Sequence, residues 1–123
     1  MTEFVGIDLV DVARIQQAVE RRGERFLKRI FTERERAYCR KKRNEYGSLA
    51  ARFAAKEAVF KAIGTGWRTG VKWTDVEVIN DGLGKPEVIL YGKVKEIVGT
   101  RNVAISLTHT REYAQAVAVL SNA

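Results

Sequence analysis

Residues 52–66, RFAAKEAVFKAIGTG, carry four charges in a segment that is otherwise apolar. At about 100° per residue, the apolar side chains occupy almost the whole circumference of the helix that this segment predicts. Glu57 and Lys61 are adjacent on that helix, with Phe53 and Phe60 beside them. An exposed pair of this kind is only a surface ion pair worth about 0.2–0.5 kcal/mol. Partly buried charges cost far more, and a metal ion or a phosphate would compensate both.

Asp8 is a second carboxylate that could belong to such a site. It lies between Ile7 and Leu9 near the end of a predicted strand. An acid at this position can also end the strand or cap the following helix, a role for which Asp11 competes. Mg²⁺ usually takes one or two carboxylates, several waters and phosphate oxygens of its substrate. Asp8 and Glu57 would form such a site if the fold brings them together.

Two further features could bind an anionic ligand. Gly64 and Gly66 follow the predicted helix, where missing side chains let a ligand approach the backbone, although Gly64 equally suits a helix C-cap. The spacing is not that of a Walker A motif. His109 is the only histidine and lies between two predicted strands. A histidine there can be structural, or can act as an acid, a base or a phosphate donor.

The first half of the chain must supply the helices that position these residues. Residues 3–10 predict a strand, and residues 12–22 predict a helix that Asp11 can cap and Gly23 ends. The apolar side of this helix consists of Val12, Ile15 and Val19. Its opposite side carries Arg14, Gln17 and Arg21, which should face solvent or a partner.

The segments that follow predict a turn and two more helices. Residues 25–31 are predicted to form a short apolar turn. Thr32 and Glu35 have the spacing of a capping box, which opens a helix that runs into the basic cluster 40–43. After a break at residues 44–47, Ser48 is expected to cap the long helix that contains Glu57.

The second half of the chain has the pattern of β structure. Four segments predict strands: 75–80, 87–91, 103–108 and 113–120. The turn NDGLGKP joins the first two, and residues 109–112 form the turn of a hairpin between the last two. Residues 93–98 predict one or two helical turns. Early helices and late antiparallel strands indicate an α+β fold, an antiparallel sheet with N-terminal helices packed against it.

Length and composition limit the possible classes of protein. The chain has 123 residues, of which 46% are hydrophobic, so a single domain over residues 1–123 is expected. No apolar run approaches the roughly 20 residues of a membrane span, and the N-terminus lacks the basic residues of a signal peptide. The one cysteine, Cys39, excludes a disulfide framework and a multi-cysteine metal site. These features predict a cytoplasmic protein.

The charge balance predicts an anionic partner. There are 22 Lys and Arg residues against 15 Asp and Glu residues, a net charge of +7. Nucleic acid, an acidic protein, an anionic membrane surface or a polyphosphate ligand would all satisfy this charge. The net charge therefore predicts the sign of the partner's charge but not its chemical class.

Four segments, in their order and spacing, resemble the small bacterial type of 4′-phosphopantetheinyl transferase: GIDLVDVARI, FTERERAYC, RFAAKEAVFKAIGTG and ISLTHTREYAQAVAV. The resemblance covers essentially the whole chain. Its most specific part is the aspartate of G-I/V-D, followed about 45 residues later by F-x-x-K-E-A/S-x-x-K. Residues 6–8 and 53–61 match these motifs without departure.

The resemblance implies an activity and an assembly. The reaction would transfer the 4′-phosphopantetheine arm of coenzyme A to a serine of apo-acyl carrier protein, releasing adenosine 3′,5′-bisphosphate. It would be Mg²⁺-dependent and would support fatty acid biosynthesis. Members of the family resemble one another in being homotrimers with each active site at a subunit interface, so the same is expected here.

The resemblance also implies roles for residues. Asp8 and Glu57 match the Mg²⁺ ligands, and Lys61 matches the lysine near the pyrophosphate. Regions that line the coenzyme pocket are matched by Arg43, Arg52, Gly64, Gly66, Pro86, His109 and Thr110. The acidic carrier protein would dock on the first helix, at Arg14 and Arg21. The base for the serine could be Glu57, His109 or metal-bound water, and the sequence does not choose among them.

Two other functions fit part of the sequence. A small nucleic-acid-binding domain would explain the net charge and the basic cluster 40–43, but zinc-finger spacing and an RNP-like motif are both absent. A non-catalytic adaptor for an acidic protein would use the face of Arg14 and Arg21. Neither explains the Glu57 and Lys61 pair, so we expect an enzyme that binds neither nucleic acid nor a membrane.

Overall fold

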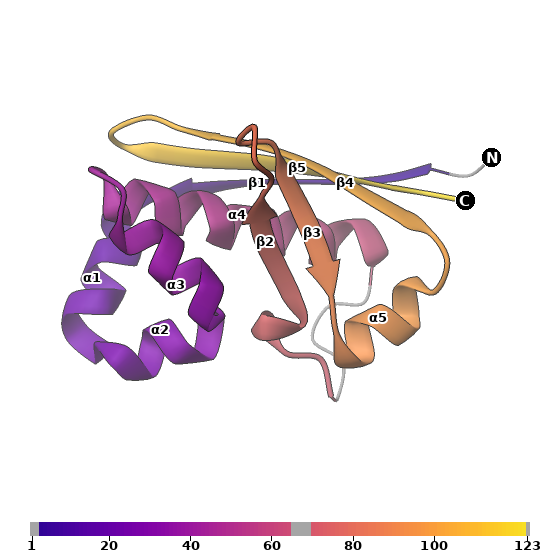
Figure 1. Ribbon diagram of the computed structural model, residues 1–123, viewed down its shortest axis with the longest axis horizontal. Helices are drawn as coiled ribbons and strands as arrows, with labels where there is room; N and C mark the ends of the chain where they lie inside the picture. The colour runs from indigo at the N-terminus through magenta and orange to yellow at the C-terminus, as the bar shows by residue number, and fades with distance from the viewer. Residues whose placement is uncertain (1–2, 65–69, 123) are drawn as a thin grey trace.

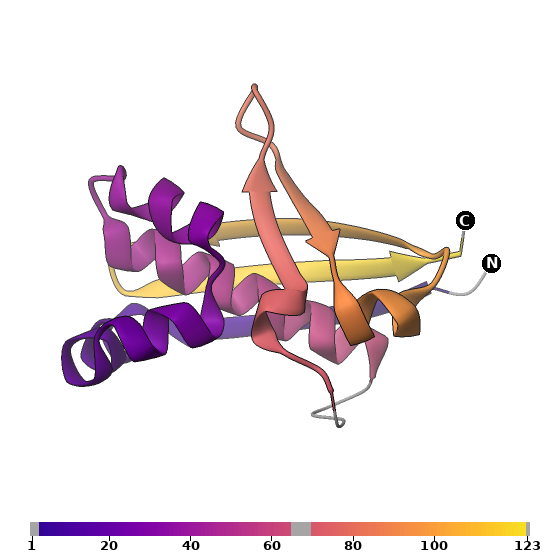
Figure 2. The ribbon, with the colours of Figure 1, turned by 60° about the horizontal axis from the view of Figure 1, so that its bottom comes forward.

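Helix α4 (Glu45–Ile63) is the element around which the others are arranged. The computed structural model describes residues 3–64 and 70–122. A three-stranded sheet lies along α4, three shorter helices gather at its N-terminal end, and a separate hairpin crosses it (Figures 1 and 2). The other elements, in chain order, are β1 (Glu3–Asp11), α1 (Val12–Arg22), α2 (Glu24–Ile30), α3 (Glu33–Arg40), the 3-10 turn η1 (Trp73–Asp75), β2 (Val76–Asn80), β3 (Pro86–Leu90), α5 (Gly92–Val98), β4 (Asn102–His109) and β5 (Tyr113–Ser121).

Both sheets are antiparallel. The larger has the order β1-β5-β4, so the last strand lies between the first strand and its own hairpin partner. In its register Asp8 is opposite Ala116, which is opposite Leu107 on the other side. Strands β2 and β3 form the second sheet. The arrangement confirms the predicted α+β fold, with α4 as the helix that packs directly on the larger sheet.

Small side chains let this sheet and α4 approach closely. The inner face of β5 consists of buried alanines at 114, 116 and 118, and α4 buries alanines along most of its length. The closest approach is at Gly6, where an added Cβ would lie 1.9 Å from Ala58 O and 2.7 Å from Ala62 N. Strand β1 therefore rests backbone to backbone on α4, and only glycine fits there.

The N-terminal helices differ from the prediction at residues 25–31. This segment is not a turn but belongs to helix α2, whose Phe26 and Ile30 lie one helical turn apart and are both buried. Gly23 has a positive φ of 60°, which ends α1 and allows α2 to start at once in a new direction. A helix of only seven residues, about two turns, forms here because tertiary packing stabilises it.

The predicted helix caps are confirmed in one case and wrong in another. Thr32 and Glu35 form the full capping box of α3. Ser48, however, does not cap α4, because Asn44 does so by accepting a hydrogen bond from Gly47 N at 2.9 Å. Ser48 is buried inside the first turns, where its hydroxyl accepts a bond from Arg52 at 3.3 Å. Asp11 occupies the N-cap position of α1 through its backbone, without a side-chain capping bond.

In the second half the predicted elements agree with the structure to within a residue or so. Strands β2 to β5 and helix α5 fall where the pattern indicates, and His109 is the last residue of β4 rather than a member of the turn. Over the described residues, no helix has both the length and the apolar character that crossing a membrane requires.

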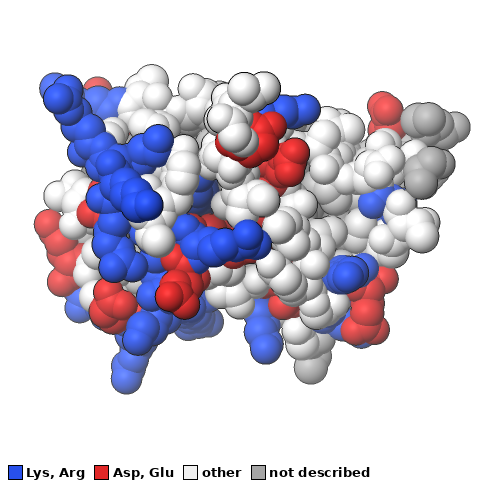
Figure 3. All heavy atoms as spheres, in the orientation of Figure 1, with Lys and Arg blue, Asp and Glu red and all other residues white. Residues whose placement is uncertain are grey.

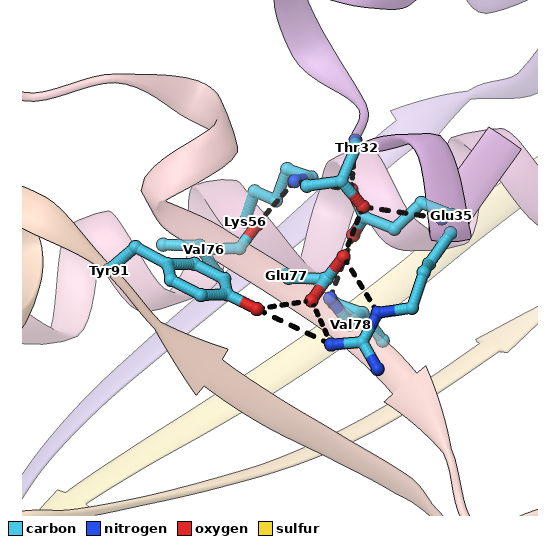
Figure 4. Close-up of polar contacts among 8 residues, drawn as sticks. Thr32, Glu35, Lys56, Val76, Glu77, Val78 and Tyr91 are labelled. Atoms are coloured by element: carbon cyan, nitrogen blue, oxygen red, sulfur yellow. Dashed lines mark hydrogen bonds and ion pairs between the residues drawn. The ribbon is translucent and has the colours of Figure 1, made fainter.

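A buried network fastens the hairpin β2–β3 to α3 and α4 (Figure 4). Lys56 and Glu35 are both fully buried, with Nζ 2.8 Å from Oε1. Lys56 also donates to the carbonyls of Trp73 and Val76, and Glu35 accepts from Val78 N at 2.7 Å. Burial lowers the pKa of Lys56, and the charge of Glu35 opposes this effect. Both charged groups therefore have hydrogen-bond partners besides each other, which a buried ion pair needs to offset its desolvation.

Candidate active site

Asp8 lies on the inner face of β1, at the point where this strand passes the last turns of α4. Its side chain is 15% exposed, and its Oδ1 is 3.0 Å from Lys61 Nζ. Lys61 also donates to the carbonyl of Ile7 at 3.0 Å. The fold thus brings together two residues that are 53 positions apart in the chain.

Glu57, one helical turn before Lys61, belongs to the same group of charges. Burial raises its pKa, and so does the negative charge of Asp8, while the positive charges of Lys61 and Arg14 partly lower it. Four charged groups from β1, α1 and α4 therefore act on one another here. The structure thus brings Asp8, Glu57 and Lys61 together, as predicted.

Aromatic side chains flank Glu57 along α4. Phe53 stacks on Trp73, with ring centroids 5.0 Å apart, and Phe60 meets the edge of the same indole at 5.6 Å. Phe60 is buried and Phe53 is half-buried. By helical spacing Phe53 and Phe60 are neighbours of Glu57 on α4, and burial is the first cause of its raised pKa.

The donor set fits a hard divalent cation that keeps most of its coordination for water and phosphate. Asp8 and Glu57 offer carboxylate oxygens from two rigid elements. Within residues 3–64 and 70–122, no group of three or more His, Cys, Asp or Glu side chains is placed to hold a metal ion. A two-carboxylate site suits Mg²⁺ bound together with a phosphate ligand, and does not suit a metal enclosed by protein ligands.

A cationic hollow of about 450 Å³ lies at the other end of α4. Its basic lining is Lys42, Arg43, Arg52 and His109, with Tyr38 and Asn80 among the other lining residues. Arg52 is 3% exposed and donates to Asn80 Oδ1. Its guanidinium lies 4.2 Å from the centroid of the Tyr38 ring, while its Nε makes no hydrogen bond. A buried guanidinium with an unused donor beside a hollow is suited to an anionic ligand.

His109 reaches this hollow because a glycine faces it. A Cβ at Gly47 would lie 2.8 Å from His109 Nδ1, so the ring rests against the first turn of α4. An adjoining hollow of about 530 Å³ includes His109, Thr110 and Arg111. The Thr110 hydroxyl accepts hydrogen bonds from Glu112 N and Tyr113 N, which holds the turn between β4 and β5.

Within one chain the hollow and the carboxylates are separate. Gly47, beside His109, precedes Glu57 by ten residues of one helix, or about 15 Å along its axis. Gly64 is at the far end of α4, where its φ of 70° makes it the left-handed C-cap. Pro86 begins β3, half-buried. Gly66 lies outside the described residues.

The predicted partner-binding arginines, Arg14 and Arg21, are exposed on α1. The basic side chains of α1, α2 and α3 gather on one end of the molecule (Figure 3). Two neighbouring hollows of about 190 and 290 Å³ open beside α1 and α2, with apolar Phe26 and Phe53 in both and arginines at 14, 22, 25 and 29 around them. We call this area, together with the exposed Arg21 of α1, the basic groove. It lies next to Glu57, whose pKa Arg14 affects.

Sequence reasoning missed several residues that build these regions. Gly6 and Gly47 act through the absence of a side chain, and Lys56 acts through full burial. Tyr38 supports Arg52 from a different helix. Of these residues, only Gly6 and Lys56 belong to the motifs noted in the sequence. Their physical roles could not be predicted, because they depend on neighbours distant in sequence.

Comparison with known proteins agrees with this fold and this group of charges. The family model of the 4′-phosphopantetheinyl transferase superfamily matches residues 4–118, and the chain belongs to this superfamily. A holo-(acyl-carrier-protein) synthase of Solibacter usitatus is 50% identical over 120 residues, which are 95% of this chain and 96% of the relative. The chain is thus an enzyme of the holo-(acyl-carrier-protein) synthase type.

Solved structures agree. A holo-(acyl-carrier-protein) synthase from Bacillus anthracis in complex with CoA (3′,5′-ADP) has a TM-score of 0.82 at 36% identity, covering 98% of this chain and 96% of that one. The enzyme of Helicobacter pylori in complex with coenzyme A has a TM-score of 0.85 at 30% identity, covering 95% and 99%.

Proposed function

We propose that this protein transfers the 4′-phosphopantetheine group of coenzyme A to a serine of apo-acyl carrier protein. The serine oxygen attacks the phosphorus that bears the pantetheine arm, the pyrophosphate P–O bond breaks, and adenosine 3′,5′-bisphosphate leaves. The observation that carries this proposal is the group formed by Asp8, Glu57 and Lys61 where β1 lies against the last turns of α4. The named relatives and the two coenzyme complexes support it.

Asp8 and Glu57 are the proposed ligands of Mg²⁺, which would neutralise charge on the pyrophosphate when bound. Lys61, one turn beyond Glu57, would contact the same phosphates. It would stabilise the leaving bisphosphate or give it a proton. The serine proton needs an acceptor, and Glu57 is the candidate already beside this group.

The cationic hollow is the proposed site for the phosphates and the adenine of coenzyme A. Arg52 and Arg43 offer guanidinium donors, and His109 offers a ring nitrogen, within one hollow. Thr110, Gly64, Gly66 and Pro86 are proposed to line the rest of the coenzyme's path. His109 belongs to this binding region rather than to the base position within one chain, because about 15 Å of helix separates it from Glu57.

The exposed face of the larger sheet supports a homotrimer. Val5, Ile7 and Leu9 of β1 are 55–63% exposed and point away from α4. Such an apolar strip is typical of a surface that another subunit covers. We propose that three chains meet there and that each active site combines the carboxylates of one chain with the cationic hollow of the next. This assembly would shorten the distance between His109 and the carboxylates.

The basic groove is the proposed docking site of the acidic carrier protein. Arg14 and Arg21 would steer it, and the apolar floor at Phe26 and Phe53 would accept an apolar side chain. The groove adjoins Glu57, so the serine of a docked carrier protein would come close to the carboxylates. We propose a role in fatty acid biosynthesis in the cytoplasm, where a reduced thiol such as that of Cys39 is usual. We further propose that the chain works as a single domain and binds neither nucleic acid nor a membrane.

The test is mass spectrometry of apo-acyl carrier protein incubated with this protein, coenzyme A and Mg²⁺. We expect the carrier protein to gain one phosphopantetheine mass, and to gain none when its acceptor serine is replaced by alanine. No mass gain with several acidic carrier proteins would remove the central proposal. A mass gain that persists in excess chelator would refute only the proposed requirement for Mg²⁺.

A further inference from the structure

Lys61 occupies the place where a cation would bind Asp8. Its Nζ lies 3.0 Å from Asp8 Oδ1 and also 3.0 Å from the carbonyl oxygen of Ile7. A carboxylate oxygen and a carbonyl oxygen from neighbouring residues of one strand are ligands that hard divalent cations prefer. The ammonium group of Lys61 therefore acts here as a single positive charge bound at metal-type ligands.

We propose that Lys61 is the counter-ion of Asp8 in the metal-free protein and leaves Asp8 when a divalent cation binds. Its ammonium group then becomes available to the phosphates of coenzyme A. The inference rests on the proposed function, because it concerns the same two carboxylates.

The metal-free protein needs such a counter-ion. Asp8 is largely buried, and Glu57 is close enough for its pKa to respond to the charge of Asp8. Two neighbouring carboxylates in a partly dry site repel each other unless a positive charge lies between or beside them. Lys61 supplies that charge by direct contact, whereas Arg14 acts on Glu57 without an ion pair to Asp8 among the described contacts.

Lys61 can also leave. Its side chain is 54% exposed and consists of a flexible four-carbon stem. It lies in the last turn of α4, three residues before the C-cap Gly64. A divalent cation on Asp8 would repel the ammonium group, and the exposed stem lets it swing toward solvent without disturbing the helix. A phosphate bound beside the carboxylates would remain within its reach.

The exchange couples two ligands. Lysine competes with the cation for Asp8, so the free protein binds the cation more weakly than its carboxylates alone would allow. Once displaced, Lys61 favours a phosphate ligand, so cation and coenzyme should each strengthen the binding of the other. Lys61, which is proposed to contact the leaving phosphate, would thus also weaken cation binding in the absence of coenzyme.

The test measures cation binding without coenzyme and without turnover. Mn²⁺ is titrated into the whole protein and followed by electron paramagnetic resonance, with Mg²⁺ calorimetry as a second reading. Lys61→Met keeps an unbranched side chain but removes the charge, and we expect it to bind Mn²⁺ at least about fivefold more tightly than wild type. Arg14→Met is the matched control, which removes a positive charge that acts on Glu57 but does not contact Asp8. It should change the affinity less than twofold, about a third of a log unit.

The other outcomes separate the two proposals. Unchanged or weaker binding in Lys61→Met, with binding still lost in Asp8→Asn, would overturn the exchange and keep the metal site. Equal gains in Lys61→Met and Arg14→Met would also overturn it, because general charge would then suffice. If Mn²⁺ bound to no variant, or bound to Asp8→Asn as well as to wild type, both the exchange and the carboxylate site would fall, while the transfer assay would still report separately on the reaction.

Discussion

The carboxyl group of Glu57 lies where its charge is unfavourable for the fold. Burial and the nearby charge of Asp8 raise its pKa. A carboxyl whose pKa is higher in the folded protein than in the unfolded chain lowers stability when it is ionised. This loss of folding stability is present at neutral pH and disappears as the pH falls below the pKa of Glu57 in the unfolded chain, near 4.5. The proposed role of Glu57 as a Mg²⁺ ligand would outweigh this cost.

Glu57→Gln tests both consequences. The change is nearly isosteric, so the fold should remain, while transfer to the carrier protein should fall at least about 100-fold because an amide is a poor ligand for Mg²⁺. The melting temperature at pH 7 should equal or exceed that of wild type. Asp8→Asn should lose activity similarly, and Glu96→Gln on α5 is the control. Wild-type turnover of both carboxylate variants at limiting Mg²⁺ would refute the metal site.

Gly6 lies two residues before Asp8 on the same face of β1, and its close contact with α4 sets the distance between Asp8 and that helix. Gly6→Ala would push a methyl group into the backbone of α4, costing about 1–3 kcal/mol and moving Asp8 from Glu57. We expect a lower melting temperature and a larger loss of activity than stability alone explains. The control is Gly82→Ala, because a Cβ there meets nothing within 4 Å. If both variants behave alike in melting and transfer assays, the close approach is unimportant.

At the scale of elements, the β2–β3 hairpin depends on Glu77. This side chain accepts hydrogen bonds from Thr32, from Arg34 at 2.6 Å and from Tyr91 at 2.8 Å (Figure 4). Burial alone would raise the pKa of Glu77, but these hydrogen bonds outweigh it and lower the pKa. Ionised Glu77 therefore stabilises the fold above the unfolded value of about 4.5, and this stabilisation is lost as pH falls through the lower folded value.

Glu77→Gln should destabilise the protein by about 1–3 kcal/mol at pH 7. The difference from wild type should shrink as the pH falls below about 4.5 and continue to shrink toward the folded pKa. Thermal unfolding followed by circular dichroism over pH 3 to 7 measures it, in steps of about half a unit. The control is Glu87→Gln, an exposed position on β3. A destabilisation that did not depend on pH would mean that packing rather than charge is responsible.

The sequence predicted those elements whose pattern is local. Alternation in β1 and β5, the capping box at Thr32 and the turn between β2 and β3 were all readable, because each depends on near neighbours. Helix α2 was missed since its stability comes from burying Phe26 and Ile30 against other elements. Ser48 and Asn44 are equally good caps in isolation. The helix starts at Glu45, so Asn44 takes the cap position and the Ser48 hydroxyl is left to accept a bond from Arg52.

The candidate site was predictable only in part, for the same reason. Asp8 and Glu57 were paired through a motif and a chemical argument, and the structure brings them together. The separation of His109 from Glu57 could not be read, because it follows from how β4 is placed along α4. Gly47, which makes room for His109, has no sequence signature beyond being a glycine near a helix start.

At the scale of the whole molecule, the basic groove should control association with an acidic partner. Complementary surface charge acts mainly on encounter and register. Arg14→Glu with Arg21→Glu should raise the KM for apo-acyl carrier protein at least tenfold, about 1.4 kcal/mol, and weaken its salt dependence. The KM for coenzyme A should stay nearly constant. Lys93→Glu with Lys95→Glu on α5 is the matched control. Unchanged carrier-protein kinetics at low salt would move docking elsewhere, with residues 40–43 the next candidate.

The exposed sheet face should control assembly. Ile7→Glu places a charge in the apolar strip and should convert a trimer into monomers with little activity, measured by sedimentation and the transfer assay. The control is Leu83→Glu, since Leu83 is 97% exposed at the tip of the β2–β3 hairpin, away from this sheet. If sites are shared between subunits, mixing inactive Asp8→Asn and His109→Ala proteins should restore part of the activity. A fully active Ile7→Glu monomer would contradict the shared site.

The strand order β1-β5-β4 has a consequence for synthesis on the ribosome. Strand β1 carries Asp8, and among the described strands it pairs with β5 alone, which follows all the other strands in the chain. Helices α1 to α4 can form as they emerge, whereas β1 must wait for Tyr113–Ser121 before it has a strand partner. Until then Asp8 would lack the strand pairing that helps to hold it beside Glu57. Activity would then require the synthesis of β5, and chains stopped before β5 would be inert rather than partly active.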